Sequence, residues 1–201
     1  MIIRLANKSD ASQIAHLHRI EINQGFLSDL GDKFLAKLYE AMTSSPYAFV
    51  IVADDSDRII GFIGACTDVK RFYKHFLKKY FFQCLIILAP KMISFSIFKK
   101  IIETLIYPKK ENKSQLPESE LFAVAVEKKS QGQGLVQNIF KAFILEMRNR
   151  NINEFKVVVG ENLPRAIGFY EKMGFKFHSL IHIHEKKPSR IYIYTINHAN
   201  N

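Results

Sequence analysis

The sequence predicts an α/β or α+β fold in which helices cover a central sheet. Short apolar runs of strand length alternate along the chain with longer segments whose apolar residues recur at helical spacing, which is typical of this class. A chain of 201 residues with 48% hydrophobic and 24% charged residues is long enough to bury a core. We therefore expect a single domain over residues 1–201, without internal repeats, that includes a basic helical insertion at about 68–117.

The first part of the chain is predicted to contain a strand, two helices and a hairpin. Ile14, Leu17 and Ile20 are spaced as on one side of a helix, and Ser45-Pro46 stops the second helix. The expected elements are a strand over 2–5, a helix capped by Asn7 or Ser9, a helix over 33–42, and strands over 48–53 and 59–67 joined by the turn 54–57.

The insertion at 68–117 differs from the rest of the chain. Aromatic and aliphatic residues at helical spacing predict two amphipathic helices, around 72–80 and 98–105, separated at Pro90 and followed by a polar loop over 109–118. Most of the net charge of +10 comes from this segment, because residues 70–113 hold eleven Lys and Arg against Glu103 and Glu111.

After the insertion, strands and helices are expected to alternate up to a terminal hairpin. The expected ranges are 121–126, 133–150, 155–159 and 163–173, with hairpin strands over 175–183 and 190–196. The turn between the first of these strands and its helix is rich in glycine and reads Gln131-Gly-Gln-Gly-Leu-Val136. A turn of this kind directs backbone N–H groups and the positive end of a helix dipole toward one point, which predicts a seat for a phosphate or pyrophosphate.

The glycine turn does not match the two common nucleotide loops. A P-loop requires Gly-Lys-Ser/Thr, which is absent here. A dinucleotide-binding fingerprint requires a third glycine at the position of Gln137. The phosphate seat therefore needs a different explanation.

A second block of residues follows the next strand and suggests one. It contains Gly160-Glu-Asn162 and then Ala166-Ile-Gly-Phe-Tyr170-Glu-Lys-Met-Gly174-Phe175. The two blocks, over about residues 120–177, together resemble the GNAT superfamily of acetyl-CoA-dependent N-acetyltransferases. The glycine turn is similar to its loop Arg/Gln-x-x-Gly-x-Gly/Ala, and the second block to its signature Asn…Ala…Phe-Tyr-x-x-x-Gly-Phe.

This resemblance implies a fold and a cofactor site. The fold would be a mixed, mostly antiparallel central sheet flanked by helices, with a helical insertion between the third and fourth strands. The co-substrate would be acetyl-CoA, with its pyrophosphate held by the backbone of Gln131, Gly132, Gln133, Gly134, Leu135 and Val136. Its pantetheine arm would pair with the backbone of Val124, Ala125 and Val126 at a splay between strands. Asn162 would bond this arm, and Ala166 and Phe169 would complete the cofactor-binding set.

Two residues depart from the most common form of the loop. Val136 stands where the family favours Gly or Ala, and we expect it to alter packing without abolishing cofactor binding. Gln131 stands where Arg is frequent, which removes a charge near the phosphates. The backbone supplies most of the phosphate contacts, so binding is expected to survive both changes.

The resemblance also suggests catalytic roles. Tyr170 would donate a proton to the departing CoA thiolate, since phenol and thiol have ordinary pKa values within about two units of each other; the alternative is a tyrosine that only packs in the core. For the base that accepts the proton of the attacking amine, we predict Glu120. Glu118, Glu161 or an ordered water are the alternatives, and Glu120 can also be a solvated carboxylate at a strand end.

The histidines and cysteines predict no further site. His182 and His184 alternate with isoleucine, which puts both on one face of a strand, and His178 lies on the same face. A third metal ligand at suitable spacing is missing, so no metal is expected. We expect His16 and His18 at the surface or the rim of the site. The two cysteines lie inside apolar sequence, which does not indicate a disulfide framework.

The expected location is the cytoplasm. Met1-Ile-Ile-Arg-Leu5 does not form a basic region followed by an apolar one, so no secretion signal is expected. No apolar run has the length of a membrane span. The protein is expected to be a monomer or a homodimer.

Three roles compete for the basic insertion. It can form a lid that binds an anionic acceptor, or a helical hairpin packed on the domain or on a second subunit. It can also make peripheral contact with an anionic membrane through Phe81, Phe82, Leu85 and Ile86 and the surrounding lysines. Nucleic acid is not expected as a partner, because the insertion contains no recognisable reading motif.

The sequence therefore predicts an N-acetyltransferase that moves acetyl from acetyl-CoA to a primary amine by direct attack in a ternary complex. The expected acceptor is a small molecule such as an amino sugar or a nucleotide sugar. The alternatives are a protein N-terminus or lysine as acceptor, or a non-catalytic acyl-CoA-binding or membrane-associated module.

Overall fold

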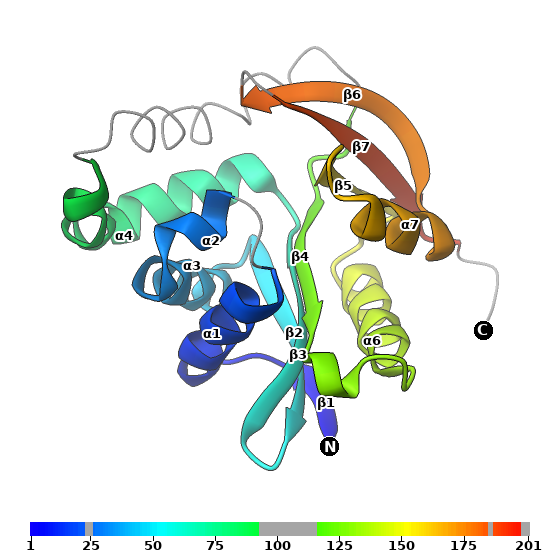
Figure 1. The fold of residues 1–201 in the computed structure, drawn as a ribbon, viewed down its shortest axis with the longest axis horizontal. Helices are drawn as coiled ribbons and strands as arrows, with labels where there is room; N and C mark the ends of the chain where they lie inside the picture. Colours follow the sequence, from blue (N-terminus) through cyan, green and yellow to red (C-terminus); the bar gives the residue numbers. More distant parts are fainter. Residues whose placement is uncertain (23–25, 93–115, 185–186, 198–201) are drawn as a thin grey trace.

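The computed structural model describes residues 1–22, 26–92, 116–184 and 187–197, and within them seven strands form one sheet with helices on both sides (Figure 1). The strands are β1 (Ile2–Leu5), β2 (Ala48–Asp55), β3 (Arg58–Cys66), β4 (Glu120–Val126), β5 (Glu154–Gly160), β6 (Lys176–His184) and β7 (Lys187–Thr195). The helices are α1 (Ala11–Glu21), α2 (Phe26–Leu30), α3 (Asp32–Ser44), α4 (Val69–Met92), α6 (Leu135–Asn149) and α7 (Pro164–Lys172), with the 3-10 turns η1 (Lys8–Asp10) and η3 (Lys128–Ser130).

The strand order across the sheet is β1-β2-β3-β4-β5-β7-β6. Every neighbouring pair is antiparallel except β4 and β5, which run parallel. These two strands pair only through Glu120 with Lys156 and Leu121 with Val157, and then separate. The sheet thus confirms the predicted mixed, mostly antiparallel class, and its parting at β4 and β5 positions the site.

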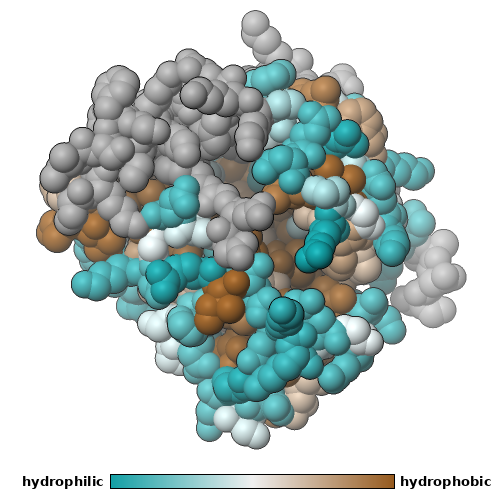
Figure 2. Space-filling model, in the orientation of Figure 1, coloured by the Kyte–Doolittle hydropathy of each residue, from teal (hydrophilic) through white to brown (hydrophobic). Residues whose placement is uncertain are grey.

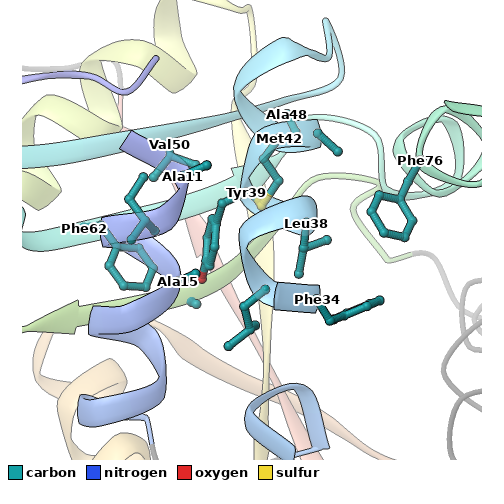
Figure 3. Packing of buried hydrophobic residues seen from close by; sticks show 14 of the residues in the cluster. Ala11, Ala15, Phe34, Leu38, Tyr39, Met42, Ala48, Val50, Phe62 and Phe76 are labelled. Carbon is teal, nitrogen blue, oxygen red and sulfur yellow. The ribbon is translucent and has the colours of Figure 1, made fainter. Parts of the chain in front are cut away.

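Two hydrophobic cores lie on opposite sides of the sheet. Side chains of β2 alternate between them, because successive residues of a strand point to opposite sides. Val50 and Val52 face the core under α1, α3 and α4, while Phe49 and Ile51 face the core under α6 and α7. Figure 3 shows the first core, where the Tyr39 ring of α3 packs edge-on against Phe62 of β3, at 5.3 Å between centroids.

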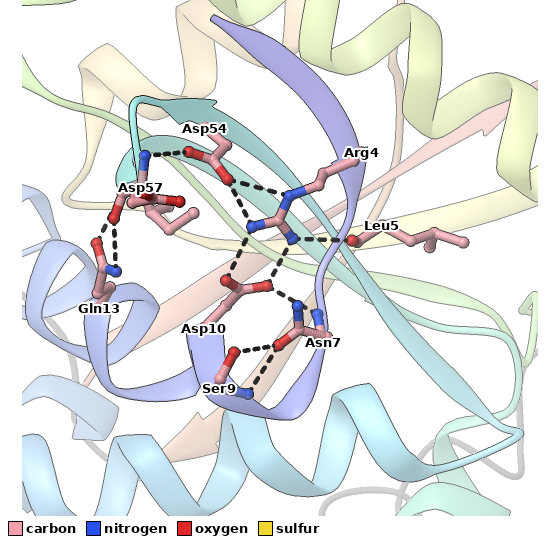
Figure 4. A network of polar contacts seen from close by, with 9 residues as sticks. Arg4, Leu5, Asn7, Ser9, Asp10, Gln13, Asp54 and Asp57 are labelled. Carbon is pink, nitrogen blue, oxygen red and sulfur yellow. Dashed lines mark hydrogen bonds and ion pairs between the residues drawn. The ribbon is translucent and has the colours of Figure 1, made fainter.

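A polar network fixes α1 against the first strands (Figure 4). The Arg4 guanidinium donates to both oxygens of Asp10 at 2.7 and 3.0 Å and to Asp54 at 2.7 Å. These bonds raise the pKa of Arg4 above its ordinary value, and the bond from Arg4 lowers the pKa of Asp10. The Gln13 amide in α1 binds the backbone of Asp57 and Ile59 at 3.0 Å each, which ties the helix to the β2–β3 turn. These contacts therefore fix the beginning of α1 against the sheet.

The insertion differs in part from the prediction. One helix, α4, runs from Val69 to Met92 and continues for two residues beyond Pro90, where a break was predicted. A proline this close to the end of a helix removes one backbone donor without interrupting the preceding turns. The second predicted helix, around 98–105, lies outside the described residues, as does most of the predicted loop over 109–118.

The predicted position of one histidine was also wrong. His18 is not at the surface or the rim, because its side chain is only 3% exposed and lies between α3 and β3. Its Nδ1 is 2.6 Å from the Tyr39 hydroxyl, and burial lowers the pKa of His18 to about 4. His16 is exposed, as predicted.

None of the helices within the described ranges is long and apolar enough to cross a membrane. The two cysteines are free and buried. Burial raises the pKa of the Cys84 thiol to about 11.

Candidate active site

The parting of β4 and β5 opens a cleft of about 830 Å³. Its walls are residues 122–126 of β4 and 158–160 of β5, and the beginnings of α6 and α7 border it. In Figure 2, apolar residues line the hollowed middle of the displayed side, where β4 and β5 part in Figure 1. The carboxyl ends of two parallel strands commonly carry ligand sites, and here both strands lead from this cleft into helices.

The glycine turn has the backbone geometry that an anion seat requires. Gly132 and Gly134 have φ angles of 78° and 75°, in the left-handed region that favours glycine. A Cβ at either position would meet no atom within 4 Å, so it is the backbone conformation that calls for glycine. Helix α6 begins directly after Gly134, and the N–H groups of its first turn have no intrahelical acceptor.

The backbone N–H groups that are free to bind an anion begin at Gly132 and not at Gln131, where the sequence analysis placed the first of them. The Gln131 N–H donates to the Lys128 carbonyl at 3.3 Å, so it belongs to the turn itself. The Gln131 side chain also takes part in the turn. Its amide donates to the Val126 carbonyl at 2.8 Å and to a Glu21 carboxylate oxygen at 3.5 Å. This side chain lines the cleft and braces the turn against the end of β4.

Glu21 is a site residue that the sequence analysis did not identify. It is the last residue of α1, and its carboxylate accepts from the Lys128 backbone N–H at 2.9 Å and from the Gln131 side chain. Glu21 also lines the cleft. A contact between residues 107 positions apart has no local sequence signal, so only the folded chain reveals it.

The beginning of α7 supplies the second side of the cleft. Pro164 occupies the first turn of the helix, and Asn162, Arg165 and Ala166 line the cleft. A Cβ at Gly160 would come within 2.9 Å of the Asn162 side-chain oxygen, so the absence of a side chain at 160 leaves room for this amide. Arg165 is exposed and brings a positive charge to the cleft that the sequence analysis did not assign.

Tyr170 lies deeper in the same helix. It is 7% exposed and lines the cleft, and its ring packs against Phe169 and Phe175 at centroid distances of 5.2 and 5.1 Å. Burial raises the pKa of Tyr170 above its ordinary value. The phenol therefore stays protonated at neutral pH and keeps a proton to give.

Glu120 lies at the closed end of the splay. Its carboxylate is 3.6 Å from the ammonium group of Lys156, which is 1% exposed and also donates to the Pro117 carbonyl at 2.6 Å. The described residues that line the cleft do not include Glu120. Its predicted role as the base remains a prediction.

The structure brings most of the predicted site residues together. The predicted residues that line the cleft are Val124, Ala125, Val126, Gln131, Gly132, Gly134, Leu135, Val136, Asn162, Ala166, Phe169 and Tyr170. Gln133 is exposed and does not line it; its side-chain amide donates to the Lys129 carbonyl at 3.3 Å. Within the described part of the chain, no three His, Cys, Asp or Glu side chains form a group that could hold a metal ion.

Comparisons with known proteins identify the family and the fold of this chain. A family model described as the acetyltransferase (GNAT) family matches residues 14–175. The comparison with curated proteins finds no match. Solved structures with the same fold include an aminoglycoside 6'-N-acetyltransferase in complex with coenzyme A, with a TM-score of 0.62, 16% identity and coverage of 100% of both chains.

Two further solved structures share the fold. One is the ribosomal-protein-S18-alanine N-acetyltransferase from Escherichia coli, with a TM-score of 0.59 and 14% identity over 100% of this chain and 96% of that one. The other is a GNAT-family acetyltransferase from Desulfovibrio desulfuricans, with a TM-score of 0.62 and 11% identity over 98% and 99% of the two chains. Because the family model spans most of the sequence, the protein belongs to the acetyltransferase (GNAT) family and is an acyltransferase.

Proposed function

We propose that the protein transfers the acetyl group of acetyl-CoA to the primary amine of a small molecule by direct attack in a ternary complex. The observation that carries this proposal is the cleft between β4 and β5, which combines a glycine turn at a helix start with a buried, protonated tyrosine. A structure of the same fold is a complex with coenzyme A, which supports an acyl-CoA as the donor.

The glycine turn would bind the pyrophosphate of CoA. The donors are the backbone N–H groups from Gly132 to Val136, at the positive end of the α6 dipole. Arg165 at the beginning of α7 lines the same cleft and would add an ionic contact to a phosphate. The Val136 side chain packs partly against the core under α6. We therefore expect it not to block the backbone N–H groups that would bind the pyrophosphate.

The open edge of β4 would bind the pantetheine arm. Beyond Leu121 the strand has no paired residue on β5, so its backbone groups on that side are available to the amides of a ligand. The ligand then takes the place of a neighbouring strand over Val124–Val126. The exposed side chain of Asn162 lies across the cleft from this edge and would bond the same arm.

The chemistry is an acyl transfer with balanced proton movements. A backbone N–H of β4 polarises the thioester carbonyl, the neutral amine attacks it to form the C–N bond, and the C–S bond then breaks. The amine loses one proton, and the departing thiolate gains one from the Tyr170 hydroxyl, which solvent reprotonates. Because burial raises the pKa of Tyr170, the phenol still holds its proton when the thiolate forms.

Water is the proposed acceptor for the proton of the attacking amine. Glu120 stands beside Lys156 and outside the cleft lining, and the Glu21 carboxylate holds the glycine turn. Water in the open cleft can take the proton from an amine that reacts in its neutral form.

The proposed acceptor is an amino sugar or a nucleotide sugar. Two solved structures with this fold are aminoglycoside acetyltransferases, which supports a sugar amine. The structural neighbour that is a ribosomal-protein alanine acetyltransferase makes a polypeptide N-terminus the second candidate.

The test is release of free thiol from acetyl-CoA by the purified protein with a panel of amines. The panel holds aminoglycosides, simple amino sugars, amino-sugar nucleotides, and peptides with a free N-terminus or lysine. We expect amine-dependent release with one of the sugar classes and an N-acetylated product by mass spectrometry. Turnover with the peptides alone would reject the small-molecule acceptor, and thiol release with no acetylated amine would reject the transfer itself.

A further inference from the structure

Helix α4 contains no acidic residue between Val69 and Met92. One side of it is buried in the core through residues spaced three or four apart, namely Val69, Phe72, Phe76, Tyr80, Cys84 and Leu88. Its other side carries Lys70, Arg71, Lys74, Lys78, Lys79, Phe81, Phe82, Leu85 and Ile86, all exposed, which we call the α4 outer face.

The second half of the α4 outer face, over residues 81–86, exposes an unusually large share of the exposed apolar side chains of this molecule. Phe82 is 76% and Ile86 75% exposed, and Phe81 and Leu85 are 48% and 40% exposed. Of the eleven exposed large hydrophobic residues in the described part of the chain, these four fall within six consecutive positions. Such a cluster marks an interaction site, whereas single exposed apolar residues do not.

The first half of the same face is cationic. Arg71 pairs with Asp68 at 3.1 Å, and the Lys79 ammonium is 5.6 Å from the centre of the Tyr80 ring. Within the described part of the chain, no ion pair neutralises Lys70, Lys74 or Lys78. The positive charge of this half therefore faces solvent.

The two halves lie on one side of the helix. A stripe of side chains at intervals of four residues runs along this side of the helix. It consists of two cations and then two apolar residues, Lys74, Lys78, Phe82 and Ile86. Figure 1 places α4 at the outer edge of the molecule beside α3, and in Figure 2 hydrophobic atoms reach that edge where α4 ends. None of its residues lines the cleft between β4 and β5.

We propose that the α4 outer face docks the protein on an anionic lipid bilayer. The apolar half enters the boundary between headgroups and acyl chains, and the cations of the other half contact the anionic headgroups. A second copy of the chain is a poor occupant, because a symmetric contact would set the same cationic helix, which has no acidic residue from Val69 to Met92, against itself. The helix lies on the bilayer and does not cross it, in agreement with the lysines along it.

The test is flotation of the purified full chain with vesicles of phosphatidylcholine alone or with 30% phosphatidylglycerol. We expect flotation with the anionic vesicles, and a loss of about fivefold in partitioning for each cation removed. The double variant Lys78→Gln/Phe82→Ser should float at least tenfold less than the parent. Raising the salt to 0.5 M should weaken binding by screening the cationic half.

A matched control on another helix separates docking from general stickiness. Lys141 and Leu145 of α6 are exposed at the same spacing, and Lys141→Gln/Leu145→Ser should float like the parent. Far-UV circular dichroism and thermal unfolding check that both variants fold. Failure of the parent to float, equal flotation with neutral vesicles, or equal losses in both double variants would overturn the proposal. So would a concentration-dependent dimer that Phe82→Ser abolishes.

Discussion

His18 shows how one buried side chain makes the stability of this protein depend on pH. Its ring stacks on Phe62 and its Nδ1 contacts the Tyr39 hydroxyl, and burial lowers its pKa to about 4 from 6.5. Between these pH values the unfolded chain binds a proton that the folded chain does not. His18 therefore lowers the free energy of unfolding as pH falls from 6.5 toward 4. Above pH 6.5 it adds no pH dependence to this free energy.

We expect the free energy of unfolding to fall across this window by about 3 kcal/mol from His18 alone. The variant His18→Gln should lose this part of the pH dependence, because glutamine does not titrate, while the contribution of the Arg4–Asp10 pair stays. His16→Gln, at an exposed position of the same helix, is the control and should keep the dependence of the parent. Urea unfolding at pH 7 and pH 4.5 measures both, and parallel curves for parent and His18→Gln would contradict the buried-histidine account.

Glu120 is the residue where the base assignment is tested. Lys156 is almost fully buried, so Glu120→Gln leaves a buried charge with weaker compensation, at a cost on the order of 3 kcal/mol. We expect a melting temperature lower by roughly 5–10 °C, with kcat of the folded variant within about threefold of the parent. An unchanged melting temperature together with a kcat at least a hundredfold lower would instead identify Glu120 as the base.

At the scale of elements, the β4–α6 turn depends on two features of different origin. The glycines give the turn its left-handed backbone, and Glu21 at the end of α1 holds it from outside. The first feature is local and the second is not. Both features hold the turn whose N–H groups from Gly132 to Val136 we propose to bind pyrophosphate.

Gly134→Ala tests the local feature. A side chain at φ 75° costs about 1–2 kcal/mol, so the turn should relax and the Kd for CoA should rise roughly tenfold. The control is Gly168→Ala inside α7, where a Cβ has no neighbour within 4 Å and helix propensity predicts equal or higher stability. Isothermal titration with CoA compares the two, and equal affinities would contradict the role given to the turn.

Glu21→Gln tests the contact between α1 and the turn. Glutamine keeps one acceptor for the Lys128 N–H but loses the charge, whereas Glu21→Ala loses both. We expect the KM for acetyl-CoA to rise about threefold with Gln and about tenfold with Ala, with kcat within twofold in both. Glu154→Gln, an exposed carboxylate on β5, should change neither parameter. A fall in kcat without a change in KM would mean that Glu21 acts on the chemistry and not on the turn.

The elements differ in how far the sequence predicted them. The β2–β3 and β6–β7 hairpins and helices α3, α6 and α7 were predicted within about three residues at each end, because apolar periodicity and turn residues are local signals. The five-residue helix α2 was missed, since it is too short to show a period. The burial of His18 was missed because its partner Tyr39 is 21 residues away on another helix.

At the scale of the whole molecule, the function follows from the place where a parallel pair of strands separates in a sheet that is otherwise antiparallel. Local patterns predict neither strand order nor this separation. The resemblance of two motifs implied a mixed sheet with a splay between strands, and the fold and family confirm the class. The cleft gathers residues from five elements, α1, β4, α6, β5 and α7. The α4 outer face lies away from it, so catalysis and membrane docking are separable by mutation.

We propose that Tyr170 protonates the departing thiolate in acetyl transfer to an amine. This proposal is tested most directly by the kcat of Tyr170→Phe, measured as thiol release from acetyl-CoA with the best acceptor. We expect kcat to fall by a factor of about 10²–10⁴, with the Kd for acetyl-CoA within threefold. Tyr194→Phe, which removes a hydroxyl from the aromatic core outside the cleft, should retain full kcat. A Tyr170→Phe variant that keeps the kcat of the parent would contradict the claim.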